Sequence, residues 1–332
     1  MTLDTYILGK NITEEYYRRN PKALEFHGDK GTEACQYDIM NYLKYLQQVA
    51  MMNVPESYQQ YISWNKTLFK NLNIPQRELL ETPMLMHEYL QEGLGMREIL
   101  QLIIEEYDSI KVESPPDESE DENSKIAREY LDLLLDGERE KAYNLIMDQY
   151  NSKRKISEIY VDIIQQVQYR VGYIRQTNEI TVAQEQYITQ ATRYLINRLY
   201  ENVQPSRKGR GKIVATCVPG EQHDMGIQLL SDLLELDGWD VIYPDPSTPA
   251  DSVDDTVRRE EPDLLSLSVT VLTNIYNARL LIEQVRENFP DVKIITGGYS
   301  FLKNRGLCKK IKSYGYAEKA LNSVRLVESL VR

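Results

Sequence analysis

The pattern of residues after Gly211 constrains the fold of this chain more than any other feature. Short apolar runs alternate there with longer stretches of helical periodicity. The runs predict strands at 213–218, 240–243, 264–269 and 292–295. Strands that alternate with helices in this way are typical of a parallel sheet covered by helices on both faces. We therefore expect the C-terminal part to be an α/β domain.

The residues before Gln204 have mostly helical periodicity and hold only seven of the sixteen glycines. A segment at 113–124 is rich in acidic residues and proline, cannot bury apolar surface, and predicts a solvated linker. A second break at 204–211 combines proline, glycine and basic residues. The expected parts are an all-α N-terminal domain at 1–112, the linker at 113–124, an all-α four-helix domain at 125–204 and the α/β domain at 208–332. The four helices are expected at 125–136, 138–150, 156–175 and 181–202.

Composition excludes several classes of protein. A net charge of −12 would repel a phosphate backbone, so we expect no direct nucleic-acid partner. No apolar stretch approaches the about 20 residues needed to cross a bilayer, and the N-terminus lacks an apolar signal core. We therefore expect a cytoplasmic protein without membrane contact. The three cysteines are too widely spaced to predict a disulfide framework or a zinc cluster.

The loops that follow the predicted strands carry the candidate binding residues. Ligands bind at the carboxyl ends of the strands in such sheets. Hydroxyls there can donate hydrogen bonds, and paired glycines let a bulky ligand approach the backbone. A dinucleotide is excluded, because a carboxylate follows the first strand where a pyrophosphate needs a helix N-terminus. The candidates are Glu221, His223, Asp224 and Gly226 after the first strand, Ser268 and Thr270 after the third, and Gly297 and Gly298 after the fourth.

Three motifs in this order, E-x-H-x-x-G, S-x-T and G-G, resemble the Rossmann-like cobalamin-binding domain over residues 212–301. The resemblance implies that His223 is the lower axial ligand of cobalt. An imidazole binds metal in its neutral form, and a carboxylate on the other ring nitrogen sets the tautomer and raises basicity. Glu221 or Asp224 is expected in that role.

The preceding unit resembles the four-helix cap that covers the upper face of cobalamin in this family. The resemblance is carried by residues 135–139, 159–160, 171–172 and 180–185. Adenosylcobalamin-dependent photoreceptors match best, because they have glutamate where corrinoid methyltransferase proteins have aspartate before the histidine. This implies adenosylcobalamin as cofactor and a response to light, in which the cobalt–carbon bond breaks and association changes. The partners would be copies of the chain or a separate output protein.

The upper-face motifs depart from the photoreceptor pattern. Arg175 and Gln176 stand where the family has Trp-His, and Gln186 replaces the histidine after Glu185. Glutamine is a poor cobalt ligand, so the expected cofactor binding is better supported than the switching chemistry. Val182 and Glu185 still match positions that face the adenosyl group. Arg175 is expected either to close over an upper ligand or to form a surface ion pair.

The N-terminal region at 26–38 resembles the helical region of photoreceptors that pair cobalamin with biliverdin, the photocobilins. The resemblance implies a second, bilin chromophore. A bilin needs an apolar slot with polar groups and sometimes a thiol. Each candidate residue also suits a purely structural role in a helical core. The candidates are Cys35, Asp38, Trp64 and His87.

Together these features predict a non-enzymatic, cobalamin-binding sensor. Two alternatives stay open. One is a corrinoid protein that carries methyl groups for a methyltransferase. The other is a degenerate interaction module that has kept the fold and no longer binds cobalamin.

Overall fold

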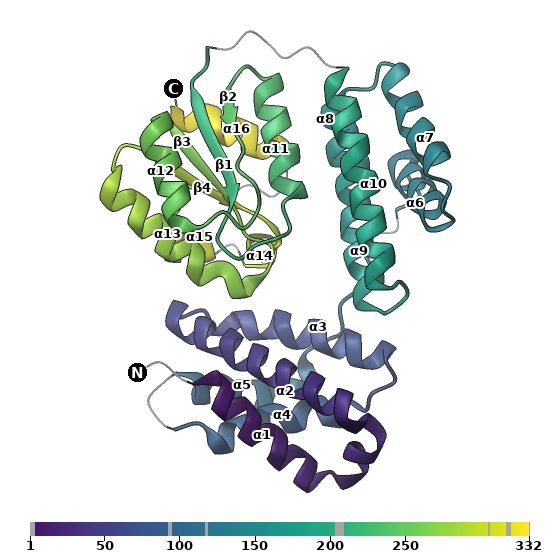
Figure 1. Ribbon diagram of the computed structural model, residues 1–332, viewed down its shortest axis with the longest axis vertical. Coiled ribbons are helices and arrows are strands. Elements are labelled where there is room, and N and C mark those ends of the chain that lie inside the picture. The colour runs from purple at the N-terminus through teal and green to yellow at the C-terminus, as the bar shows by residue number, and fades with distance from the viewer. Residues whose placement is uncertain are drawn as a thin grey trace. The chain divides into compact units, whose positions relative to one another are not determined.

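The four predicted strands form one parallel sheet in the protein's structure, a computed structural model (Figure 1). The structure describes residues 4–91, 95–116, 119–202, 209–304, 306–316 and 320–331. The strand order is β2-β1-β3-β4, and every neighbouring pair is parallel. The expected α/β fold class is therefore confirmed. The strands are β1 (Lys212–Cys217), β2 (Asp240–Ile242), β3 (Leu264–Ser268) and β4 (Lys293–Gly297).

Helices cover both faces of the sheet. Ile213, Ala215 and Cys217 of β1 share a core with α11 and α16. Alternate residues of a strand point to opposite faces, and α12 and α13 lie on the other face (Figure 1). The helices of this domain are α11 (Met225–Leu236), α12 (Ala250–Glu260), η4 (Leu272–Asn274), α13 (Ile275–Asn288), α14 (Tyr299–Lys303), α15 (Leu307–Lys310) and α16 (Ala320–Val331).

A helical cap precedes the sheet. Its first helix begins at Glu122, inside the expected linker, because the Asp121 side chain accepts a hydrogen bond from the amide of Ser124 at 2.8 Å and caps it. The expected third helix contains a π-helical turn. The expected break at 204–211 lies largely outside the described residues. The cap helices are α6 (Glu122–Leu135), α7 (Arg139–Asn151), α8 (Ile156–Glu158), the π-helical η3 (Ile159–Ile164), α9 (Gln165–Gln176) and α10 (Val182–Glu201).

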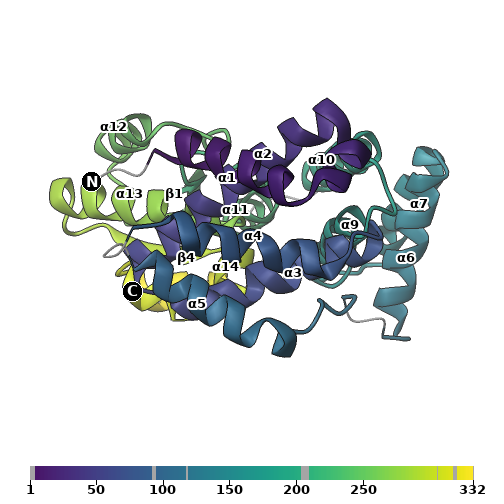
Figure 2. The same cartoon turned by 90° about the horizontal axis from the view of Figure 1, so that it is seen from below.

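The N-terminal helices form a compact unit of their own. The chain divides into two such units, Met1–Ser114 and Pro115–Arg332. The buried ammonium of Lys66 donates to the carbonyls of Tyr107 and Ile110, which ties α3 to the end of the unit. Figure 2 shows these helices from below. They are α1 (Thr5–Arg19), α2 (Pro21–Met52), η1 (Pro55–Ser57), α3 (Tyr58–Asn71), α4 (Gln76–Tyr89), α5 (Met96–Glu106) and η2 (Tyr107–Ser109).

The cap packs on α11, the helix that follows the candidate site. Met225, Leu229 and Leu233 of α11 belong to the same buried cluster as the cap core. Burying such a side chain is worth about 1.5–3 kcal/mol. Polar contacts run alongside, and Tyr160 of the π-helical turn donates to Asp232 at 2.9 Å. The cap is thus attached to the helix that begins directly after His223.

Asp232 should make this attachment sensitive to pH. Burial raises the pKa of Asp232 to about 7, whereas an unfolded aspartate has a pKa of about 3.9. The native chain therefore holds a proton that the unfolded chain loses, and stability falls as pH rises from about 4 through about 7. We expect Asp232→Asn, which keeps an acceptor for Tyr160, to raise the free energy of unfolding by about 1 to 2 kcal/mol at pH 8 and by less at pH 5.

Urea unfolding of the full chain at both pH values measures this difference. Asp132→Asn, at an exposed position on α6, is the matched control and should leave the pH profile unchanged. Parallel profiles for wild type and Asp232→Asn would contradict the assignment.

Candidate functional site

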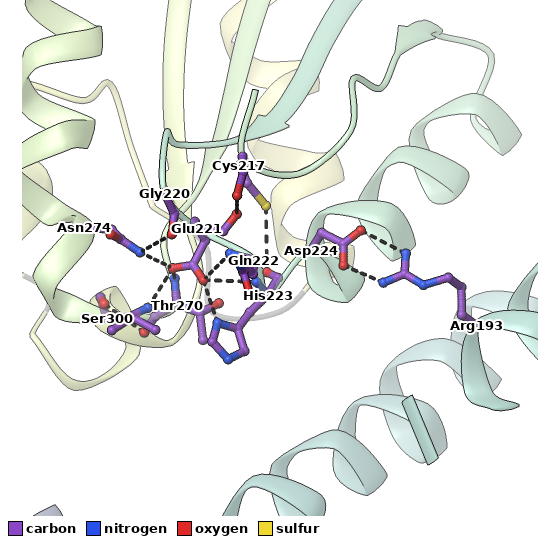
Figure 3. A network of polar contacts seen from close by, with 12 residues as sticks. Arg193, Cys217, Gly220, Glu221, Gln222, His223, Asp224, Thr270, Asn274 and Ser300 are labelled. Atoms are coloured by element: carbon purple, nitrogen blue, oxygen red, sulfur yellow. Dashed lines mark hydrogen bonds and ion pairs between the residues drawn. The ribbon is translucent and has the colours of Figure 1, made fainter. Parts of the chain in front are cut away.

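The site is built around the loop that joins β1 to α11. Gly220 turns the chain with a φ of +85°, a conformation that favours glycine. Glu221 then points inward and is fully buried, whereas the His223 side chain is 59% exposed. α11 begins two residues later, at Met225. Figure 3 shows the imidazole pointing away from the strand ends.

The Glu221 carboxylate is held by donors on both of its oxygens. Oε1 accepts the Gln222 amide at 3.1 Å and the His223 amide at 3.0 Å. Oε2 accepts the amides of Thr270 and Val271 at 2.9 and 2.8 Å. Two further residues anchor Glu221. Asn274 Nδ2 donates to Oε2 at 3.1 Å, and Ser247 donates to the Glu221 carbonyl through its amide and its hydroxyl, each at 3.2 Å.

These donors decide the ionisation of Glu221. Burial would raise the pKa, but the hydrogen bonds from His223 and from the Val271 amide outweigh it and lower the pKa to about 2. The residue is therefore a buried carboxylate, compensated entirely by N–H donors. It ties the β1 loop to the loop after β3.

The carboxylate also orients the candidate ligand. His223 Nδ1 lies 2.6 Å from Glu221 Oε1. This hydrogen bond raises the pKa of His223 and leaves Nε2 as the nitrogen available to a metal. An imidazole held in one tautomer by a carboxylate is the arrangement that makes it a more basic metal ligand. The structure thus places Glu221, and not Asp224, in the orienting role.

Asp224 has different partners. Its carboxylate accepts two hydrogen bonds from Arg193 of α10, at 2.6 and 2.8 Å, and one from the hydroxyl of Tyr243 at 2.7 Å. These donors outweigh burial and lower the pKa of Asp224. Its side chain binds the cap (Figure 3).

The residues at the ends of β3 and β4 leave room for a large ligand. Ser268 and Gly297 are register partners on these strands. Among the described residues, the hydroxyls of Ser268 and Thr270 have no hydrogen-bond partner. A Cβ atom at Gly297 would meet no atom within 4 Å, and the same holds for Gly226. The donors and the open space fit a cofactor that reaches these strand ends.

Gly298 has the opposite character. Its φ is +103°, and a Cβ atom there would lie 2.3 Å from the carbonyl oxygen of Val269. Glycine is therefore required at this position so that the chain can pass close to the end of β3.

The four predicted upper-face residues lie around the α9–α10 turn of the cap. Arg175 Nε lies 3.4 Å from Glu185 Oε2, and both side chains are about one-third exposed. Arg175 therefore forms the ion pair that was one of its two expected roles. Gln176 is buried and Val182 is exposed. The Glu185 charge contributes to the raised pKa of His223, which places it within electrostatic range of the candidate ligand.

The predicted bilin residues are distributed over three helices of the N-terminal unit. Cys35 and Asp38 lie one turn apart on α2, and burial raises the pKa of the Cys35 thiol to about 11. Trp64 lies on α3 and is 41% exposed, and His87 is half-buried on α4. The four residues thus come from α2, α3 and α4, three different helices of this unit.

Sequence reasoning missed several residues of the network. Asn274 is the last residue of η4 and Ser247 lies in the loop after β2, and both reach Glu221 only after the sheet has formed. Arg193 lies in the middle of a cap helix, and its bond to Asp224 joins residues 31 positions apart. The polar type of Asn274 before a helix was the one available signal, and it also suits an ordinary cap.

Two family models match this chain. Residues 211–325 match a B12 binding domain, and residues 126–200 match a second model that is also described as a B12 binding domain. The matches cover the sheet with its histidine loop and the helical cap. They support a cobalamin-binding protein.

Known relatives are corrinoid proteins. The chain is 23% identical over 131 residues to the methanol–corrinoid protein of Methanosarcina barkeri, an alignment that spans 40% of this chain and 50% of that protein. It thus matches about half the length of that curated relative. The solved monomethylamine corrinoid protein of Methanosarcina barkeri shares the fold, with a TM-score of 0.56, 17% identity, and coverage of 62% of this chain and 99% of that chain.

Two features are absent from the described residues. None of their helices is long and apolar enough to cross a membrane. They also contain no group of three or more His, Cys, Asp or Glu side chains placed to hold a metal ion.

Proposed function

We propose that this chain binds a corrinoid through His223 and carries a cobalt-bound methyl group for a separate partner enzyme. The observation that carries the proposal is the exposed His223 imidazole, oriented through Nδ1 by the fully buried carboxylate of Glu221. The names of the methanol–corrinoid and monomethylamine corrinoid proteins support a methyl group as the carried group, and a carrier that does not catalyse the transfer needs a separate enzyme. The chain itself would act as a carrier without catalysing the transfer.

The chain's own residues would divide the work between the two faces of the cofactor. Bound cobalamin supplies a cobalt atom that accepts and releases the carried group. His223 Nε2 would bind the cobalt, while Glu221 keeps Nδ1 protonated and the ring oriented. The hydroxyls of Ser268 and Thr270 would bind polar groups of the cofactor beside Gly297. The cap would limit access of water and partner from above.

The upper face favours a carrier over the predicted light sensor. The Arg175–Glu185 ion pair and buried Gln176 occupy the α9–α10 turn. An ion pair provides no aromatic surface for stacking an adenosyl group, and an amide is a poor replacement for a histidine ligand. A small upper ligand such as methyl needs neither feature.

Binding in darkness separates the candidates. The full chain is titrated with methylcobalamin, adenosylcobalamin and biliverdin, and absorption and elution volume are recorded before and after green and red light. For a methyl carrier we expect methylcobalamin to bind with histidine ligation, at least as tightly as adenosylcobalamin, without a light-dependent change of elution volume.

Other outcomes overturn this proposal in favour of a named rival. Selective retention of adenosylcobalamin with a light-dependent change of elution volume supports the sensor, and retained biliverdin adds the second chromophore. Retention of no corrinoid leaves the degenerate interaction module.

A further inference from the structure

The residue directly after the candidate ligand is bound by the cap. The Asp224 side chain is 4% exposed, and it flanks the start of α11. Each of its oxygens accepts a hydrogen bond from a guanidinium nitrogen of Arg193, at 2.6 and 2.8 Å. Paired hydrogen bonds between a guanidinium and a carboxylate fix geometry as well as adding energy. Asp224 is therefore held in one position relative to α10.

The same contact continues one turn further along both helices. Arg193 Nη1 also donates to Gln228 Oε1 at 3.2 Å, and Gln228 Nε2 donates to Asn197 Oδ1 at 3.0 Å. The two α10 residues are four positions apart, as are Asp224 and Gln228. Residues at this spacing share a helix face, so α10 and the first turn of α11 are joined in register.

The histidine is consequently held between two anchors. On one side Glu221 is bound to the loop after β3 through the amides of Thr270 and Val271. On the other side Asp224 is bound to the cap through Arg193 (Figure 3). The first anchor belongs to the α/β domain, whereas the second belongs to the element that covers the upper face.

We propose that Arg193 is a positioning residue for the cobalt ligand, through which the placement of the cap controls ligation by His223. The inference rests on the proposed corrinoid binding by His223. When α10 stays in place, the Arg193–Asp224 pair holds the 223–224 peptide, and the imidazole meets the cobalt. When the cap moves to admit a partner, this pair breaks, and Asp224 keeps only its hydrogen bond from Tyr243 beside the Glu221 anchor of the histidine loop. Opening the upper face thereby loosens the lower ligand.

The ligation state is read by spectroscopy on the full chain. The probe is hydroxocobalamin, bound to protein labelled with 15N-histidine and then reduced to the cob(II) form. Its EPR spectrum shows a 15N splitting only when a histidine is the axial ligand, whereas the cofactor's own base gives a 14N splitting, and the nitrogen splitting below is that of 15N. We expect Arg193→Met to shift the ratio of histidine-ligated to unligated cofactor roughly tenfold towards the unligated form, because bonds to charged groups are the strong ones. Arg193→Lys keeps the charge but not the paired geometry, so its ratio should lie between those of the wild type and Arg193→Met.

Two controls isolate the specific contact. Arg198→Met is the same substitution on the same helix, at an exposed ion pair with Glu201, and should keep wild-type ligation. Tyr200→Phe removes a different bond between the cap and α11, the one to Glu235. It leaves the Arg193–Asp224 pair intact and should not change the nitrogen splitting.

A double-mutant cycle completes the test. Asp224→Asn should lower histidine ligation as much as Arg193→Met does, and the double variant should lower it no further. Full nitrogen splitting in Arg193→Met, or equal losses in Arg193→Met and Tyr200→Phe, would overturn the positioning role. If Arg193→Met does not fold in a thermal melt, Arg193→Lys and Asp224→Asn decide the same question. Absence of nitrogen splitting in the wild type rejects the proposed function itself.

Discussion

Replacing His223 with alanine should move the spectrum of bound cobalamin to the form without a histidine ligand. The imidazole is the one side chain of the β1 loop that is both exposed and oriented by a buried carboxylate. Loss of even a supporting partner of a metal ligand costs roughly 10- to 100-fold in affinity, so loss of the ligand should cost at least as much. Titration of wild type and His223→Ala with methylcobalamin, followed by absorption, measures both effects.

His87→Ala is the matched control for this experiment. It removes a histidine from α4, in the N-terminal unit, and should leave affinity and spectrum unchanged. An unaltered cobalamin spectrum in His223→Ala would reject the ligand assignment. A changed spectrum in both variants would show that the change is not specific to loss of the His223 imidazole.

Replacing Glu221 with glutamine should cause the largest loss of stability at this site. The carboxylate accepts hydrogen bonds only from N–H donors, and a glutamine would turn its own NH₂ group towards some of them. Leaving buried donors without an acceptor, with the charge removed, costs about 3–5 kcal/mol. Urea unfolding of the cobalamin-free chain measures the loss of stability. The imidazole of His223 should also lose the fixed orientation that Glu221 gives it.

The effect of Glu221→Gln should depend on pH with a definite sign. The pKa of Glu221 is lowered to about 2, so its stabilisation is complete above the unfolded pKa of about 4.3 and is lost as pH falls towards 2. The difference between wild type and variant should therefore shrink below pH 4. Glu283→Gln, at an exposed ion pair with Arg279 on α13, should cost less than about 1 kcal/mol. Equal losses in the two variants would contradict the anchoring role of Glu221.

The two anchors of the histidine loop have different consequences for function. Glu221 is tied to the sheet, which keeps the imidazole at the carboxyl edge whatever the cap does. Asp224 is tied to α10 by two hydrogen bonds from Arg193 and to the α/β domain by one from Tyr243, so most of its support depends on the cap. A carrier needs both properties, because it must retain its cofactor while opening the upper face to a partner.

Much of this architecture was readable from local patterns. The four strands were expected within a few residues of their observed bounds, because buried parallel strands appear as apolar runs between turns. The capping pair of Thr181 and Gln184 predicted the start of α10, and both of its hydrogen bonds are present. The glutamate–histidine spacing placed the two residues in one loop, although the carboxylate that orients the ring was left open between Glu221 and Asp224.

The tertiary structure decided what the loop residues contact. Glu221 meets amides 49 and 50 positions away, and Asp224 meets Arg193 on a different domain. The sequence alone determined the fold class and the position of the histidine at the strand ends, because these depend on periodicity and spacing along the chain. The division of labour between the two carboxylates depends on which donors the folded loops and cap bring to each buried oxygen, and only the assembled structure decides that.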